Sequence, residues 1–173
     1  MNRKNQTGVG MFEVLVALFV LAIGVLGFSA LQLRAVDATI EANDKTLAMN
    51  VARDLAERIR INRLSLGNYT NAINTQTFNT TCLIATAPNS RPTCNGATLA
   101  QYDAREIVQI AQNQGQQIAM ADCQGSTRTC IYVAWGHTNI VISNNNVVSV
   151  DVTSCMNNGS YVANAKCVVL EAF

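Results

Sequence analysis

The sequence predicts an α+β protein, in which a long N-terminal helix packs its outer half on a small antiparallel β-sheet. Three observations lead to this class. Residues 14–33 are apolar and uncharged, residues 34–62 carry apolar side chains at helical spacing, and short segments rich in β-branched residues occupy the last part of the chain. A length of 173 residues suits one modest domain with one accessory segment.

The N-terminal helix is expected to run from about residue 11 to residue 62, because no proline interrupts the chain between Gly8 and Pro88. Residues 14–33 can cross a membrane, since a helix of about 20 residues spans roughly 30 Å. Arg3 and Lys4 precede this run and should stay in the cytoplasm, so the rest of the chain should lie outside. No A-x-A pattern follows, which argues against an ordinary secretory signal.

Gly24 and Gly27 lie in the middle of the apolar run. Each costs up to about 1 kcal/mol relative to alanine in a helix interior. They predict either close helix packing through small residues or a weak point where the helix can stretch or melt, and both interpretations stay open.

The outer half of this helix, residues 34–62, is expected to be amphipathic. Its apolar stripe consists of Val36, Ile40, Leu47, Val51, Leu55 and Ile59, widened by Ala48, Ala52 and Ala56. The charged residues fall largely off this stripe and are expected to form a solvated face: Asp37, Glu41, Asp44, Lys45, Arg53, Asp54, Glu57 and Arg58.

The remaining residues, 63–173, predict a globular domain of loops, one helix and a sheet. The polar stretch "LGNYTNAINTQTFNTT" is expected to be a surface loop. Residues 98–114 suit a second helix that starts with a capping box of Thr98 and Gln101 and ends near Gly115. The segments "CIYVAW", "NIVIS", "VVSVDV" and "KCVVLEAF" predict a small antiparallel meander.

All six cysteines lie beyond the long helix, at Cys82, Cys94, Cys123, Cys130, Cys155 and Cys167. No CxxC pair occurs and only one histidine is present, so three disulfides in an oxidising compartment are expected rather than a metal site. Six cysteines allow fifteen pairings. Their order favours pairing of neighbours, which would close short loops and leave Arg128 as a candidate exposed cation in the loop 123–130.

The sequence does not predict an enzyme. No nucleophile, base and orienting group recur in a known pattern, and the one histidine, His137, is expected to lie on the surface. The net charge of +1 and the absence of a dense basic cluster indicate no nucleic-acid binding. We therefore expect no cofactor and no small-molecule substrate.

Glu13 does not fit the apolar helix that it precedes. A carboxylate in lipid or in an apolar core costs free energy unless it is paired. The position of Glu13 therefore predicts a partner of opposite charge. One alternative is a simple signal anchor, in which Glu13 sits at the level of the lipid headgroups.

A short basic leader that ends in glycine, then four residues, then glutamate and an unbroken apolar helix resembles the start of type IV prepilins. The resemblance implies that prepilin peptidase cuts after Gly8 and N-methylates Val9, where the family usually has phenylalanine. Residues 1–8 would be a leader peptide, 9–62 a helical spine and 63–173 a periplasmic domain, as in the type IV pilin fold. The Glu13 carboxylate would then pair with the freed α-amino group of a neighbouring subunit and set axial register.

The stretch "FEVLVALFVLAIGVLGFSALQLRAV" is similar to the minor pilins of the PilV type, also called pilus modification proteins. That similarity implies a protein of the bacterial inner membrane that joins other minor pilins and the major pilin in a priming or tip complex for pilus assembly. Two alternatives are a minor pseudopilin of type II secretion and a membrane-anchored periplasmic binding or enzyme domain with an uncut anchor.

Overall fold

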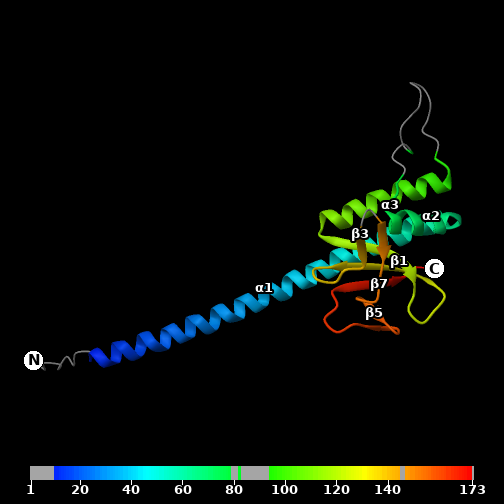
Figure 1. Ribbon diagram of the computed structural model, residues 1–173. Coiled ribbons are helices and arrows are strands. Elements are labelled where there is room, and N and C mark those ends of the chain that lie inside the picture. The colour runs from blue at the N-terminus through cyan, green and yellow to red at the C-terminus, as the bar shows by residue number, and fades with distance from the viewer. Residues whose placement is uncertain (1–9, 79–81, 83–93, 145–146, 173) are drawn as a thin grey trace, which may run out of the picture. The chain divides into compact units, whose positions relative to one another are not determined.

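The computed structural model describes residues 10–78, 82, 94–144 and 147–172, and every structural statement below concerns these residues (Figure 1). The chain divides into two compact units, Met1–Ala42 and Asn43–Phe173. One helix, α1 (Met11–Ile61), supplies the described part of the first unit and continues into the second. The second unit thus begins within α1.

The second unit combines helices with three small sheets. After α1 it contains, in chain order, the short 3-10 helix η1 (Arg63–Ser65), α2 (Leu66–Thr75), α3 (Gly96–Asn113), β1 (Gln116–Asp122), β2 (Thr129–Trp135), β3 (Val141–Asn144), β4 (Val147–Val150), β5 (Met156–Asn157), β6 (Ser160–Tyr161) and β7 (Cys167–Glu171). The main sheet has three antiparallel strands in the order β1-β2-β7, and β3-β4 and β5-β6 form separate pairs.

The two faces of the main sheet have different coverings. On one face, Val51, Leu55 and Ile59 of α1 form a core with Met120 and Val133 of the sheet. On the other face, Tyr132 and Ala134 pack with residues from the chain between β2 and β7, including Ile140, Val152 and Cys155. This alternation is what a strand buried on both faces requires, and six of the seven residues of β2 are buried. The predicted α+β class, with a long N-terminal helix on a small antiparallel sheet, is confirmed.

The predicted meander is wrong in its connections. Strands β3 to β6 lie between β2 and β7 in sequence, yet β7 pairs directly with β2, with Ile131 opposite Leu170. The sequence prediction also missed β1, which pairs with β2 across the loop 123–130. β1 and β7 complete the sheet on either side of β2. The segment between β2 and β7 in the sequence can therefore cover the face of the sheet opposite α1.

Residues 66–75 form α2 rather than the predicted surface loop. Tyr69, Ala72 and Ile73 recur at helical spacing and are buried in the core, whereas the asparagines and threonines of this helix are half-buried or exposed. Burial of this apolar face outweighs the low helix propensity of Asn and Thr. The prediction failed because the polar residues outnumber the apolar ones.

The second predicted helix exists as α3, but it begins earlier than expected. Asn95, not Thr98, is its N-cap: the Asn95 side chain accepts a hydrogen bond of 2.8 Å from the Thr98 amide. The Thr98 hydroxyl in turn donates to the Asn95 carbonyl at 3.1 Å. The helix ends just before Gly115, whose φ of +70° suits glycine after a helix, and this end agrees with the prediction.

Candidate functional site

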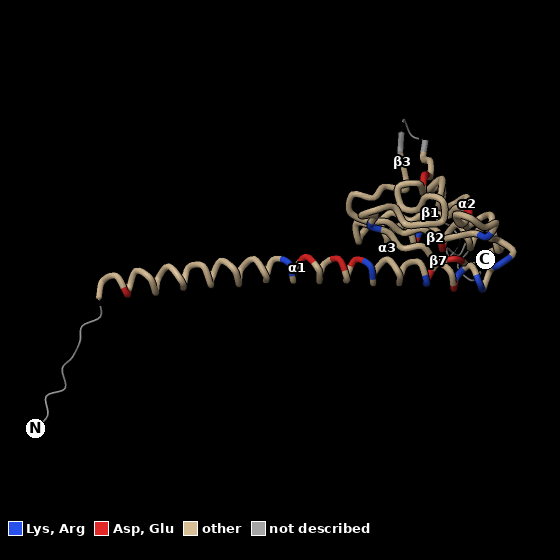
Figure 2. The backbone as a smooth tube through the Cα atoms, turned by 90° about the horizontal axis from the view of Figure 1, so that it is seen from below, with Lys and Arg blue, Asp and Glu red and all other residues tan. Residues whose placement is uncertain are grey.

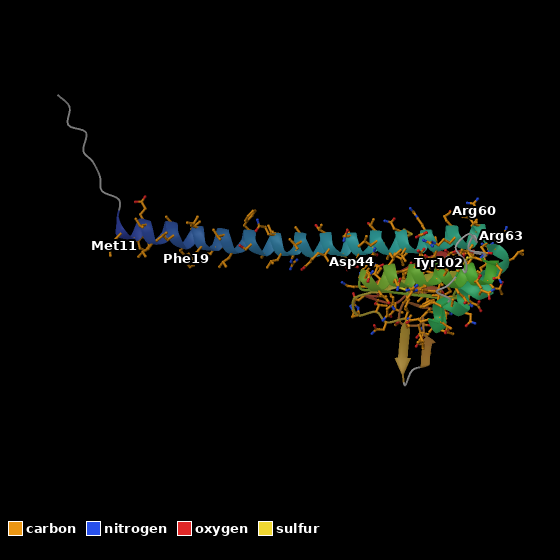
Figure 3. The ribbon with its side chains drawn as sticks, turned by 90° about the horizontal axis from the view of Figure 1, so that it is seen from above. Met11, Phe19, Asp44, Arg60, Arg63 and Tyr102 are labelled. Atoms are coloured by element: carbon orange, nitrogen blue, oxygen red, sulfur yellow. A yellow bond between two sulfur atoms is a disulfide. The ribbon has the colours of Figure 1, made fainter. Side chains whose placement is uncertain are left out.

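The first unit carries a long apolar surface along its helix. From Met11 to Ile40 the large apolar side chains are 46% to 84% exposed, and none is buried. The mean hydropathy of the most apolar 18-residue window is 2.8. Figure 2 shows this uncharged stretch along the first half of α1, and Figure 3 shows side chains such as Phe19 projecting from it. The helix is long and apolar enough to cross a membrane, which is consistent with membrane anchoring.

Glu13 lies in the first turn of α1, next to this apolar surface. Its amide donates a 2.9 Å hydrogen bond to the Gly10 carbonyl, which fixes the turn, and the helix N-terminus favours a negative charge at this position. None of the ion pairs in the described part of the chain includes Glu13.

The side chain of Glu13 borders a shallow depression on one face of the helix. Its volume is about 480 Å³, and its other lining residues are Val14, Ala17, Leu18 and Leu21. A lone carboxylate at the end of an apolar strip can pair with one cation, and burial of the strip would strengthen that pair because the local dielectric falls.

The predicted cleavage and methylation residues, Gly8 and Val9, lie outside the described residues. Gly24 and Gly27 are described, and α1 runs through both without interruption. A Cβ added at either glycine would meet no atom within 4 Å, so the packing of this chain alone does not require glycine there.

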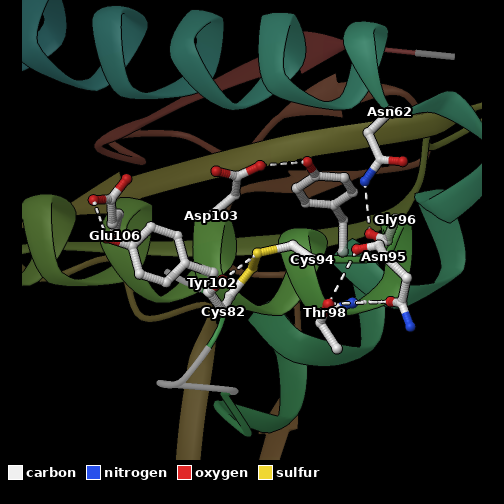
Figure 4. Close-up of a disulfide and its surroundings, with 10 residues drawn as sticks. Asn62, Cys82, Cys94, Asn95, Gly96, Thr98, Tyr102, Asp103 and Glu106 are labelled. Carbon is white, nitrogen blue, oxygen red and sulfur yellow. Dashed lines mark hydrogen bonds between the residues drawn. A yellow bond between two sulfur atoms is a disulfide. The ribbon is translucent and has the colours of Figure 1, made fainter. Parts of the chain in front are cut away.

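Three disulfides hold the second unit: Cys82–Cys94, Cys123–Cys130 and Cys155–Cys167. They join neighbours along the chain, which is the pairing favoured by the order of the cysteines. Figure 4 shows the first of them beside α3, close to Tyr102. In the loop closed by the second, Arg128 is exposed and forms an ion pair with Glu171 of β7.

A charge cluster around Arg58 was missed by the sequence analysis, which placed this residue on a solvated face. Its guanidinium contacts Asp54 at 3.0 Å, Asp103 at 2.9 Å and Glu106 at 2.8 Å. The Asp54 contact has a sequence signal in its i,i+4 spacing, but the contacts to α3 have none. Burial would lower the pKa of Arg58, but the hydrogen bonds that its guanidinium donates to Asp54, Glu106 and Asp103 outweigh burial and raise that pKa. The cluster ties α1 to α3.

Among the described residues, no group of three or more His, Cys, Asp or Glu side chains could hold a metal. His137 is exposed, and its Nε2 lies 3.0 Å from the Asn164 carbonyl oxygen.

Comparison with known proteins gives one match. Residues 30–105 match the model of the Tt1218-like family, described as type IV pilin Tt1218. No match was found among curated proteins or among solved structures. Together with the long N-terminal helix, the antiparallel sheet and the three disulfides, the family match supports a place in the type IV pilin superfamily, a pilin role and a pilin fold. Pilins are structural proteins that associate with other pilins. The matched residues begin beyond Glu13.

Proposed function

We propose that this chain is a minor type IV pilin of the PilV type. Prepilin peptidase would cut it after Gly8 at the inner membrane, and its outer unit would lie in the periplasm. The mature chain would then join other minor pilins in a priming or tip complex that supports assembly of the major pilin. The match of residues 30–105 to a type IV pilin family supports the pilin role.

One observation carries the proposal: Glu13 is a carboxylate at the start of a long apolar helix, and none of the ion pairs among the described residues includes it. In lipid that carboxylate can reach the headgroups, but in a packed bundle of helices it needs a cation. The α-amino group that cleavage would free at Val9 is a cation of the right depth on a neighbouring subunit. Removal of one partner of a buried pair typically costs about 3 to 5 kcal/mol, which is enough to select one axial register.

The first experiment is an intact-mass measurement of the full-length protein after expression in its own cells and extraction from the membrane. We expect the loss of residues 1–8 and the addition of one methyl group. A mass that corresponds to the uncut chain would overturn the proposal and leave a membrane-anchored periplasmic domain.

The second experiment replaces Glu13 by glutamine, which keeps the shape and removes the charge. We expect Glu13→Gln to stay in the membrane fraction at the parental level, while its amount in sheared filaments falls by about tenfold or more, because the neighbouring amine loses its partner. The matched control is Asp37→Asn, the same type of change at an exposed position of the same helix. Parental amounts of Glu13→Gln in filaments would rule out the pairing role.

A further inference from the structure

The main sheet has two edges, and side chains cover only one of them in the described chain. At the β1 edge, the Asn74 amide of α2 donates to the Met120 carbonyl at 2.6 Å and accepts from the Met120 amide at 2.9 Å. The side-chain Oε1 of Gln117 accepts hydrogen bonds from the amides of Ile140 and Val141 at 2.9 and 3.1 Å. The Asn74 contact occupies both outward backbone groups of Met120 and so blocks the addition of another strand there.

The β7 edge is open by comparison. The Trp135 amide donates to the Lys166 carbonyl and the Ala172 amide donates to the Thr129 carbonyl, both at 3.0 Å. In an antiparallel pair, successive residues of a strand point their backbone N–H and C=O groups alternately toward the partner strand and away from it. The backbone groups of Val169 and Glu171 therefore point away from β2. The Val169 amide has only the exposed Tyr161 hydroxyl, at 3.3 Å. The other outward groups of these two residues have no hydrogen-bond partner within the described ranges.

A basic groove runs along the helix side of this edge. It has a volume of about 640 Å³ and lies between β7, through Leu170 and Ala172, and the end of α1. Its charged lining comprises Arg53, Arg60 and Arg63 against Glu57 and Glu171. Glu57 is engaged with Arg60 at 3.7 Å, and Glu171 is engaged with Arg128. Three arginines against two glutamates leave this lining with a net positive charge.

A second groove lies along the opposite face of the same edge. It has a volume of about 330 Å³, and Val169 and Tyr161 line it together with Gln124, Ser126 and Met156. The acidic Glu171 also lines it, together with polar and apolar groups, and no basic residue does. An open strand edge thus lies between a basic groove and a second groove without positive charge.

We propose that β7 is a strand-addition site for an extended segment of a partner protein that carries acidic side chains at alternate positions. The backbone of such a segment would pair with Val169 and Glu171, and its side chains would alternate between the two faces. Side chains opposite Leu170 would enter the basic groove, beside Arg53 and Arg60, where carboxylates fit best. Those opposite Val169 would enter the second groove, where a carboxylate would meet Glu171.

Charge disfavours a second copy of this chain as the occupant. A second β7 strand would present Val168 and Leu170 to the basic groove, because these residues share the helix-facing side of the strand. Neither of these side chains carries a charge, so they would leave the arginines of the groove without a counter-ion. A partner with carboxylates at alternate positions would supply one.

The test uses the full-length protein in a non-ionic detergent and a fluorescein-labelled nine-residue peptide of alternating threonine and glutamate, followed by fluorescence anisotropy. There are two matched control peptides. The first carries lysine in place of glutamate. The second carries N-methyl groups on the threonines, whose backbone amides would otherwise pair with the β7 edge. We expect the glutamate peptide to bind at least about tenfold more tightly than either. Arg53→Glu combined with Arg60→Glu should weaken its binding by about tenfold. Lys45→Glu, a charge reversal on the same helix outside the groove, should not.

Four outcomes would overturn the inference. The N-methylated peptide or the lysine peptide could bind as tightly as the glutamate peptide, or the glutamate peptide could fail to bind at millimolar concentration. Finally, the protein could associate with itself in a way that the glutamate peptide does not inhibit. Binding that is insensitive to N-methylation would mean that the site is only a charged surface. Self-association that the glutamate peptide does not inhibit would mean that a second copy of this chain occupies the site. None of these outcomes involves Glu13 or Gly8, so this inference and the proposed function fail independently.

Discussion

Asn74 performs for the β1 edge what a neighbouring strand would otherwise do, since its one side-chain amide pairs with both the N–H and the C=O of Met120. We expect Asn74→Ala to lower the free energy of unfolding by about 1 to 3 kcal/mol, because two partly buried backbone groups lose their partner. Urea denaturation of the full-length protein in detergent, followed by circular dichroism, measures this.

The matched control for this substitution is Asn71→Ala, an exposed asparagine on the same helix. It should change the free energy of unfolding by no more than about 0.5 kcal/mol. Equal losses for the two variants would show that helix propensity, not the contact with Met120, accounts for the effect.

Tyr69 makes the stability of the second unit depend on pH in the alkaline range. Its hydroxyl donates a 2.6 Å hydrogen bond to Asp103, and burial, then this bond, raise the pKa of Tyr69 above its usual value near 10. A tyrosine with a raised folded-state pKa contributes its full stability below the unfolded pKa, and that contribution declines as pH rises from there toward the folded pKa.

We therefore expect the free energy of unfolding to fall between about pH 9 and pH 11, and to fall less steeply in Tyr69→Phe. Tyr132, whose pKa burial also raises, should leave a residual slope in that variant. Denaturation curves at a series of pH values, with the disulfides verified as intact, provide the measurement. Parallel slopes for the parent and Tyr69→Phe would contradict this account.

The sequence could not predict these residue contacts, because they join distant segments. Arg58 and Asp54 are one helical turn apart and were recognisable as neighbours, but Asp103 and Tyr69 reach Arg58 only after α2 and α3 have packed on α1. The role of Asn74 likewise depends on β1, and neither α2 nor β1 was expected. By contrast, Glu13 stood out from the sequence alone, since it is a single acid beside an uncharged run.

At the scale of elements, α1 was predictable because its signal is long and repeated: no proline, an apolar run, then apolar residues at helical spacing. The helix α2 was not, because only its buried face carries apolar residues among many asparagines and threonines. The strands β2 and β7 were found from their β-branched residues, but their direct pairing was not. Pairing across an intervening segment of about 30 residues has no local signal in the sequence.

The first half of α1 provides a prediction about Gly24 and Gly27. The helix is unbroken at both and no atom of this chain would meet an added Cβ, so we favour a role in packing against another helix over a weak point. Gly24→Leu and Gly27→Leu should keep membrane insertion but lower incorporation into filaments by about tenfold, as one misfitted side chain costs 1 to 3 kcal/mol.

Gly24→Ala and Gly27→Ala are the matched controls, because alanine adds a small side chain and favours the helix. They should assemble far better than the leucine variants, measured as the ratio of sheared-filament to membrane-bound protein. If the alanine variants fail as completely as the leucine variants, helix flexibility rather than packing is the function of these glycines.

At the scale of the whole molecule, the disulfides stabilise the outer unit by closing short loops, with sequence separations of 12, 7 and 12 residues. We expect Cys155→Ser combined with Cys167→Ser to lower the free energy of unfolding by roughly 2 to 3 kcal/mol or more, because this bond closes a loop and both cysteines are buried. Urea denaturation under non-reducing conditions tests this.

The pair Cys123→Ser and Cys130→Ser is the comparison. It opens the shortest loop, so its loss should be the smaller of the two. A larger loss for this pair would mean that the short loop, rather than the core around Cys155, limits stability.

The placement of these bonds also has a mechanical consequence. Every cysteine lies beyond α1, so no covalent cross-link joins that helix to the sheet it covers. A force that pulls on the helix is resisted by the burial of Val51, Leu55 and Ile59 and by the ion pairs of Arg58. A reducing agent should therefore make the loops of the second unit more mobile. It should leave the force needed to separate α1 from the sheet almost unchanged.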